Sequence, residues 1–140
     1  MFEIELIKKE LKEIYDKIPN FECKHCHKCC GPIIWFKVEE LLIKDYMKKN
    51  KIEDVKWTAD DFKKNDMKCP FLKNDRCIIY EVRPIVCRLQ GNIPELQCRF
   101  NKNAYMSEEL VKNIKKDFIK LNKKLQGDNM FYSTRKIAKI

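Results

Sequence analysis

Three stretches of the chain repeat hydrophobic residues at the spacing of an amphipathic helix. They cover residues 3–18, about 38–49 and 107–126, and the first carries mixed charge on its opposite face. The third begins after Ser107, a residue suited to the N-cap position. Its apolar stripe consists of Leu110, Ile114, Phe118, Leu121 and Leu125. The pattern therefore predicts a helix near each end of the chain and a further helix between them.

Shorter apolar runs in the middle of the chain indicate a β-hairpin followed by a short helix. The runs Cys69–Leu72 and Cys77–Tyr80 flank a polar turn, Lys73–Arg76. Pro84 suits the first turn of a helix that ends at Leu89. This part of the chain is therefore expected to fold into two small, compact elements.

Three other segments carry no regular period. Residues 21–32 hold four cysteines and two histidines, which we interpret as a loop. Residues 51–68 are polar and irregular, as in a surface connection with a short extended piece. Residues 128–140 form a basic tail for which the sequence predicts no element.

Together these elements predict an α+β fold that is mostly helical, with helices packed around a cysteine-rich loop region and one small β-hairpin. The length of 140 residues fits one domain. We therefore expect a single domain over residues 1–140, with a cysteine-cluster core at about 20–100 and helical segments at 3–18 and 107–126.

Charge and hydropathy exclude a membrane-spanning chain. The longest stretch free of Asp, Glu, Lys and Arg is Cys29–Phe36, far short of the roughly 20 apolar residues that a spanning helix needs. The first residues place Glu3 and Glu5 where a signal peptide requires basic residues. These features predict a cytoplasmic protein.

The eight cysteines are the most informative residues in the chain. Four form the run Cys23-x2-Cys26-x2-Cys29-Cys30, and the others are Cys69, Cys77, Cys87 and Cys98. Two intervening residues allow a turn to aim successive sulfurs at one point, the local geometry of zinc knuckles and iron–sulfur loops. In a reducing cytosol, clustered cysteines favour metal ligation over disulfides. The pattern therefore indicates a metal site.

The residue pattern leaves several arrangements open. Eight thiols could supply two four-thiolate zinc sites, or one [4Fe–4S] cluster with spare thiols. Some distal cysteines could instead be buried apolar residues. Disulfides remain an alternative, because a Lys- and Glu-rich composition also suits a hyperthermophile.

The ordered motifs of this region resemble the CxxCxxCC cysteine-cluster family, whose domain is described as zinc- or iron-chelating. The resemblance covers roughly residues 20–100 and includes the four-cysteine run, Cys69-Pro70-Phe71-Leu72, Cys77-Ile78-Ile79-Tyr80 and Arg83-Pro84-x2-Cys87-Arg88. It implies that all eight cysteines are potential metal ligands. The flagellin lysine methylases are similar in the cysteine region, which favours an iron–sulfur cluster and raises methyl transfer as an activity.

Other side chains near the cysteines have an ordinary and a functional interpretation. His25 and His27 could replace thiolate ligands, but with eight cysteines present we expect them to line the site or face solvent. Arg83, Arg88 and Arg99 could bind an anion or donate hydrogen bonds to a cluster. For Arg83 and Arg88 we favour a role as counter-charges to thiolates.

Three classes of function follow, in descending order of support. The first is a metal-binding protein that holds an iron–sulfur cluster or zinc. The second is a cluster-dependent enzyme, either methylase-like or redox, although the chain has no Gly-rich nucleotide loop and no Ser/His/Asp set. The third is a nucleic-acid-binding zinc module, suggested by the net charge of +9 and by lysines away from the stripe of the last helix. These lysines are Lys112, Lys116, Lys120, Lys123 and Lys124.

Overall fold

The computed structural model describes residues 2–20, 31, 34–55, 57–74, 76–98, 105–126 and 131–133. Its α-helices are α1 (Phe2–Asp16), α2 (Lys37–Lys49), α3 (Ala59–Lys64), α4 (Ile85–Leu89) and α5 (Glu108–Gln126). Its strands are β1 (Ile34–Phe36), β2 (Leu72–Lys73), β3 (Arg76–Cys77) and β4 (Phe131–Ser133), and η1 (Tyr80–Val82) is a 3-10 turn. The mostly helical α+β class predicted from the sequence is confirmed.

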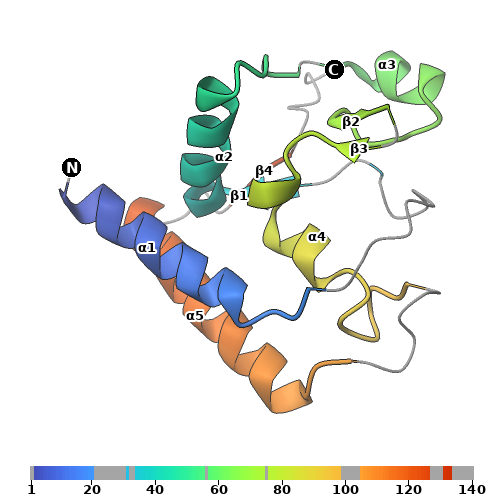
Figure 1. Ribbon diagram of the computed structural model, residues 1–140. Helices are drawn as coiled ribbons and strands as arrows, with labels where there is room; N and C mark the ends of the chain where they lie inside the picture. Colours follow the sequence, from blue (N-terminus) through green and yellow to red (C-terminus); the bar gives the residue numbers. More distant parts are fainter. Residues whose placement is uncertain are drawn as a thin grey trace.

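Helices α1, α2 and α5 pack on one another and enclose the larger of two hydrophobic clusters. Figure 1 shows α1 and α5 side by side at one end of the molecule, with α3 and the β2–β3 hairpin at the other end. We call this cluster the helical core, and its buried residues are Ile7, Leu11, Ile14, Tyr15, Ile18, Val38, Leu42, Ile85, Leu89, Ile93, Met106, Ile114, Phe118 and Leu121. Because the helical faces predicted from periodicity supply most of these side chains, the two terminal helices are confirmed.

A second cluster lies under the hairpin and contains cysteine side chains. We call it the thiol core, and its buried residues are Trp35, Ile43, Met47, Cys69, Phe71 and Ile79. Partly buried residues packed against it are Ile52, Val55, Leu72, Cys77, Ile78, Val82 and Cys87. The cysteines in this cluster come from three neighbouring segments of the chain, at the turn before β2, in β3 and in α4, which the fold brings together.

Strand β1 contributes to both cores because neighbouring side chains of a strand point in opposite directions. Phe36 packs edge-on against Phe118 of α5 in the helical core, with ring centroids 4.8 Å apart. Trp35 lies in the thiol core, where its ring centroid is 5.9 Å from that of Phe71. Helix α2 repeats this division, since Leu42 belongs to the helical core and Ile43 to the thiol core.

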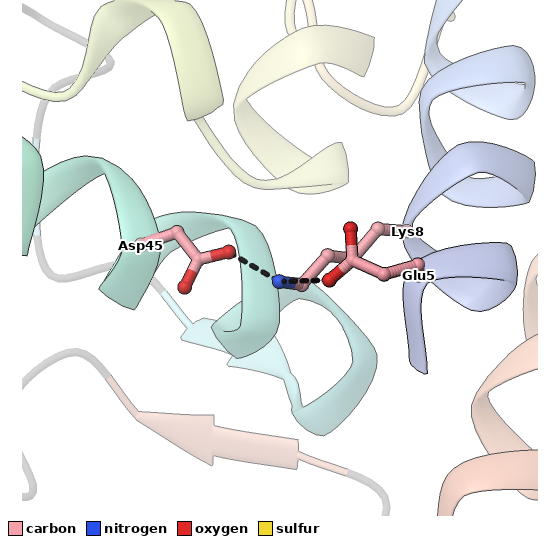
Figure 2. A network of polar contacts seen from close by, with 3 residues as sticks. All are labelled: Glu5, Lys8 and Asp45. Carbon is pink, nitrogen blue, oxygen red and sulfur yellow. Dashed lines mark hydrogen bonds and ion pairs between the residues drawn. The ribbon is translucent and has the colours of Figure 1, made fainter. Parts of the chain in front are cut away.

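Polar side chains also join the helices. The buried Asn122 of α5 accepts a hydrogen bond from the Val38 backbone N–H in the first turn of α2, at 3.0 Å. At the surface, Lys8 of α1 reaches between Glu5 of its own helix and Asp45 of α2, as Figure 2 shows. The pKa of Lys8 is raised, chiefly by its hydrogen bond to Asp45.

The structure adds four elements that the sequence pattern did not predict: β1, α3, η1 and β4. Helix α3 lies inside residues 51–68, which were interpreted as an irregular connection with a short extended piece. Its start is fixed by a capping box, in which Thr58 accepts from the Asp61 backbone and Asp61 accepts from the Thr58 backbone. Strand β4 pairs antiparallel with β1, so part of the terminal segment left without an element forms a strand.

The remaining predicted elements are in place. The hairpin is shorter than expected, since Lys73 pairs with Arg76 and leaves only two residues for the turn. The short helix begins after Pro84, which is its N-cap, and Ser107 Oγ accepts from the Leu110 N–H at the start of α5. The five lysines predicted to lie away from the α5 stripe are exposed, and Lys124 pairs with Glu10 of α1 at 3.6 Å.

Candidate metal centre

Three of the four distal cysteines are brought together in the thiol core. Cys69 precedes β2, Cys77 ends β3, and Cys87 lies in the middle of α4. Cys69 is buried, whereas Cys77 and Cys87 are half-buried, and all three are free thiols. The hairpin holds two of them close in space because Leu72 pairs with Cys77 directly after the Cys69 turn. The fold therefore gathers thiols from three separate elements.

The surroundings of these thiols disfavour their charged form. Burial raises the pKa of Cys69 to about 11, although a backbone hydrogen bond from Phe71 lowers it and the neighbouring Cys77 raises it. The pKa of Cys87 is also raised, first by burial and then by Cys69 and Cys77. Without a cation these sulfurs are neutral thiols. A metal ion reverses this preference because it binds thiolate and displaces the protons.

One polar atom of the thiol core lacks a hydrogen-bond partner. Within the described ranges, the indole Nε1–H of Trp35 is the one buried side-chain nitrogen or oxygen left unpaired, and this side chain is only 4% exposed. Buried donors nearly always have a hydrogen-bond partner, so an unpaired donor of this kind indicates that an acceptor is absent from the structure. Metal-bound thiolates would supply acceptors in this cluster. The residues present therefore fit a thiolate-bound metal group.

The described residues just before the other four cysteines make hydrogen bonds to the segments that flank α4. Cys23, Cys26, Cys29 and Cys30 lie outside the described residues, but the residues that lead into the loop are described. The buried Asn92 donates to the Pro19 carbonyl at 3.0 Å, and Arg83 donates to the Asn20 side-chain oxygen at 2.6 Å. The chain therefore enters the loop beside α4, the helix of Cys87.

Gly31, the first described residue after these cysteines, lies beside the connection between α3 and β2. Gly31 lies so close to the chain before Cys69 that a Cβ atom at this position would be 3.3 Å from the Met67 carbonyl oxygen. Such an approach is tighter than ordinary packing, which explains why the residue after the cysteine pair is glycine. The two ends of the loop thus lie next to segments that carry Cys69 and Cys87.

Of the other candidate metal ligands, only Cys98 is among the residues that the structure describes, and it stands apart from this grouping. Cys98 is a half-buried free thiol that is not among the side chains of the thiol core. His25, His27 and Arg99 lie outside the described residues. In the part of the chain that the structure describes, no three His, Cys, Asp or Glu side chains are close enough together to hold a metal ion by themselves.

Arg83 and Arg88, the candidate arginines that the structure describes, have structural partners. Arg83 stacks on the Tyr80 ring, 3.9 Å from its centroid, and donates to the Tyr80 carbonyl at 2.9 Å. Arg88 stacks on the Tyr15 ring at 3.8 Å and donates to the carbonyls of Arg83 and Glu81. Arg83 also lowers the pKa of Cys87, which agrees with the counter-charge role expected for it.

Sequence reasoning missed a buried carboxyl group that holds α4 in position. Glu39 of α2 is fully buried and accepts from the Tyr15 hydroxyl at 2.6 Å and from the Phe36 N–H at 3.0 Å. It also accepts from the backbone N–H of Ile85, in the first turn of α4. Burial raises its pKa to about 7 despite these donors. Its position three residues after Phe36, at the start of a helix, was the one available signal.

The fold and the site define a small, mostly helical domain that gathers buried thiols around the ends of a cysteine loop. Residues 22–124 match the CxxCxxCC family, described as "Putative zinc- or iron-chelating domain", and the chain belongs to this family. Comparison with curated proteins and with solved structures gave no match. None of the described helices is long and apolar enough to cross a lipid bilayer.

Proposed function

We propose that the protein binds an iron–sulfur cluster through its cysteines, with residues 1–140 acting as one metal-binding domain. The observation that carries the proposal is the convergence of Cys69, Cys77 and Cys87 on one apolar cluster. Membership of a zinc- or iron-chelating family supports metal binding by such cysteines. The ligands are drawn from the eight cysteines: Cys23, Cys26, Cys29, Cys30, Cys69, Cys77, Cys87 and Cys98.

Iron–sulfur is favoured over zinc by two features. The loop spaces three cysteines two residues apart, as iron–sulfur loops do. Cys69, Cys77 and Cys87 lie among hydrocarbon side chains, and apolar surroundings limit the access of solvent to a cluster. When bound, a [4Fe–4S] cluster would supply one-electron chemistry or a purely structural cross-link. Both roles are compatible with a cytoplasmic, reducing compartment.

Anaerobic purification of the full chain tests the proposal. We expect a brown protein with a broad absorption in the visible range, and with iron and acid-labile sulfide in near-equal amounts. A matched variant, Cys69→Ser, keeps the volume of the side chain but removes a soft ligand, so its iron content should fall.

The opposite results are equally clear. Colourless protein with stoichiometric zinc would contradict the iron–sulfur cluster and would indicate a zinc site with cysteine ligands. Protein with neither metal, and with no titratable thiols after denaturation, would contradict metal binding and support disulfides.

A further inference from the structure

The unpaired indole of Trp35 is unusual for its surroundings. The side chain is 4% exposed, and its Nε1–H has no partner among protein atoms. The second tryptophan, Trp57, is half-buried and packs edge-on against Phe62, with ring centroids 5.2 Å apart. Burial of a large aromatic ring is common, but burial of its polar N–H without an acceptor is rare.

The composition of the thiol core restricts what could accept this hydrogen bond. Apart from Trp35 itself, its members carry only hydrocarbon or sulfur side chains. The sulfurs belong to Met47, Cys69, Cys77 and Cys87. A thioether and a neutral thiol are weak acceptors, whereas a metal-bound thiolate carries negative charge and is a strong one. Among the described side chains of the thiol core, ionised cysteines are therefore the strong acceptors available to the indole.

Strand β1 fixes the direction in which the indole points. Trp35 pairs with Tyr132 of β4, and the next residue, Phe36, is committed to the helical core by its contact with Phe118. Since adjacent strand residues alternate, Trp35 must face the thiol core. The neighbouring ring of Phe71 further restricts rotation of the indole. The N–H is thus held in place before any metal binds.

We propose that the Trp35 Nε1–H donates a hydrogen bond to a sulfur of the metal centre and thereby tunes its stability. This inference rests on the proposed function, because it requires a metal bound through cysteines. Trp35 is a positioning residue, not a ligand. Hydrogen bonds to the sulfurs of a cluster raise its reduction potential, since they stabilise the more negative, reduced state. At a zinc site the same bond strengthens metal binding.

The test compares Trp35→Phe with Trp57→Phe in the full-length, metal-loaded protein. Both variants lose one indole, but only the first loses the buried donor. In an iron–sulfur protein, Trp35→Phe should shift the midpoint potential to more negative values at unchanged iron content, and Trp57→Phe should leave it at the wild-type value. In a zinc protein, Trp35→Phe should weaken zinc binding in a chelator competition by about 10- to 100-fold.

A second replacement avoids the cavity that phenylalanine leaves. In the Trp57→Phe background Trp35 is the only tryptophan, so biosynthetic incorporation of benzothienylalanine replaces this one indole. The sulfur analogue keeps the shape of the ring system and removes only the N–H. It should reproduce the effect of Trp35→Phe on potential or affinity while leaving the circular dichroism spectrum unchanged.

The outcomes separate this inference from the proposed function. If the wild-type protein holds its metal but both Trp35 replacements match Trp57→Phe, the hydrogen bond is overturned and the metal site stands. If the wild-type protein holds neither iron nor zinc, the proposed function fails and this inference fails with it.

Discussion

Glu39 shows how one buried residue connects the helical core to the helix that carries Cys87. Its carboxyl group accepts from Tyr15 of α1, from Phe36 of β1 and from Ile85 of α4. Arg88 stacks on the ring of the same Tyr15. A buried carboxylate with this number of donors is tolerated because its acceptor sites are satisfied.

The raised pKa of Glu39 leads to a pH-dependent stability. Burial places the pKa at about 7 in the folded chain, compared with 4.5 for an exposed glutamate. The folded state therefore holds this proton more tightly, and the stabilisation is complete below pH 4.5 and is lost as the pH rises through 7. Relative to Glu39→Gln, the free energy of unfolding of the wild-type protein should fall by about 3 kcal/mol between pH 5 and 8. Urea unfolding of both proteins across this range measures the difference.

The two proteins share their other titrating groups, but the Glu39 charge also raises the pKa of Cys87, so the measured difference includes that effect. Glu40→Gln provides the control, because the Glu40 carboxyl pairs with Lys44 at 3.3 Å near the surface. The free energy of unfolding of Glu40→Gln should depend on pH in the same way as that of the wild-type protein. A pH-independent difference between the wild type and Glu39→Gln would contradict a titrating Glu39.

At the scale of elements, the packing of α5 against β1 is centred on one aromatic contact. Phe118 is buried and meets Phe36 at 4.8 Å, whereas its neighbour Ile119 is exposed. Phe118→Ala should lower the free energy of unfolding by about 3–5 kcal/mol, because it removes a large buried side chain and leaves a cavity. Ile119→Ala should change it by about 0.5 kcal/mol or less. Chemical denaturation measures both, and equal effects would contradict the assigned face of α5.

Helix α3 depends on its cap instead of on a long apolar face. Thr58 and Asp61 exchange side-chain hydrogen bonds with each other's backbone, and Phe62 is the one buried residue that α3 contributes. Thr58→Ala should cost about 1 kcal/mol locally and increase the amide exchange rate of Phe62 about fivefold. Thr58→Ser keeps the hydroxyl group and should exchange at the wild-type rate. The same slow exchange in the alanine variant would show that the cap is dispensable.

These elements also show what sequence can and cannot predict. The faces of α1 and α5 followed from periodicity, since each buries one continuous stripe. Helix α3 is too short to show a period, and its capping box was the only local signal. The pairing of β1 with β4 joins segments almost a hundred residues apart, so no local pattern could reveal it. The burial of Glu39 could not be predicted locally, because its partners Tyr15 and Ile85 come from other elements.

For the candidate site, too, the sequence predicted one part and the fold was needed for the other. The spacing of the cysteines predicted metal chemistry, and the family match supports it. The grouping of Cys69, Cys77 and Cys87 in one cluster required the fold, as did the orphan N–H of Trp35. The assignment of all eight cysteines as ligands stays a prediction, since four of them lie outside the described residues.

For the whole molecule, removal of the metal should weaken both cores together. Strand β1 and helix α2 contribute side chains to each core, so loss of order in the thiol core is transmitted to the helical core. A metal present at about a thousand times its dissociation constant stabilises the folded state by roughly 4 kcal/mol. Chelation should therefore lower the melting temperature by roughly 10 °C or more, and Cys26→Ser should do the same without chelator.

Differential scanning calorimetry before and after chelation measures this loss. Addition of stoichiometric metal to the chelated protein, after removal of the chelator, should restore the original transition. An unchanged melting temperature in the chelated protein and in Cys26→Ser would show that the folded state does not depend on metal.

The hydrogen bond between Arg83 and Asn20 joins positions 63 residues apart and marks where the cysteine loop meets α4. A metal bound by thiols from both sides of this contact would act on the denatured chain as a cross-link. Closing a loop of this length reduces the entropy of the unfolded ensemble by an amount equivalent to about 4 kcal/mol in the chain-entropy treatment of disulfides. The cysteines would then give a small protein the stabilising effect of a disulfide without a covalent bond between sulfurs.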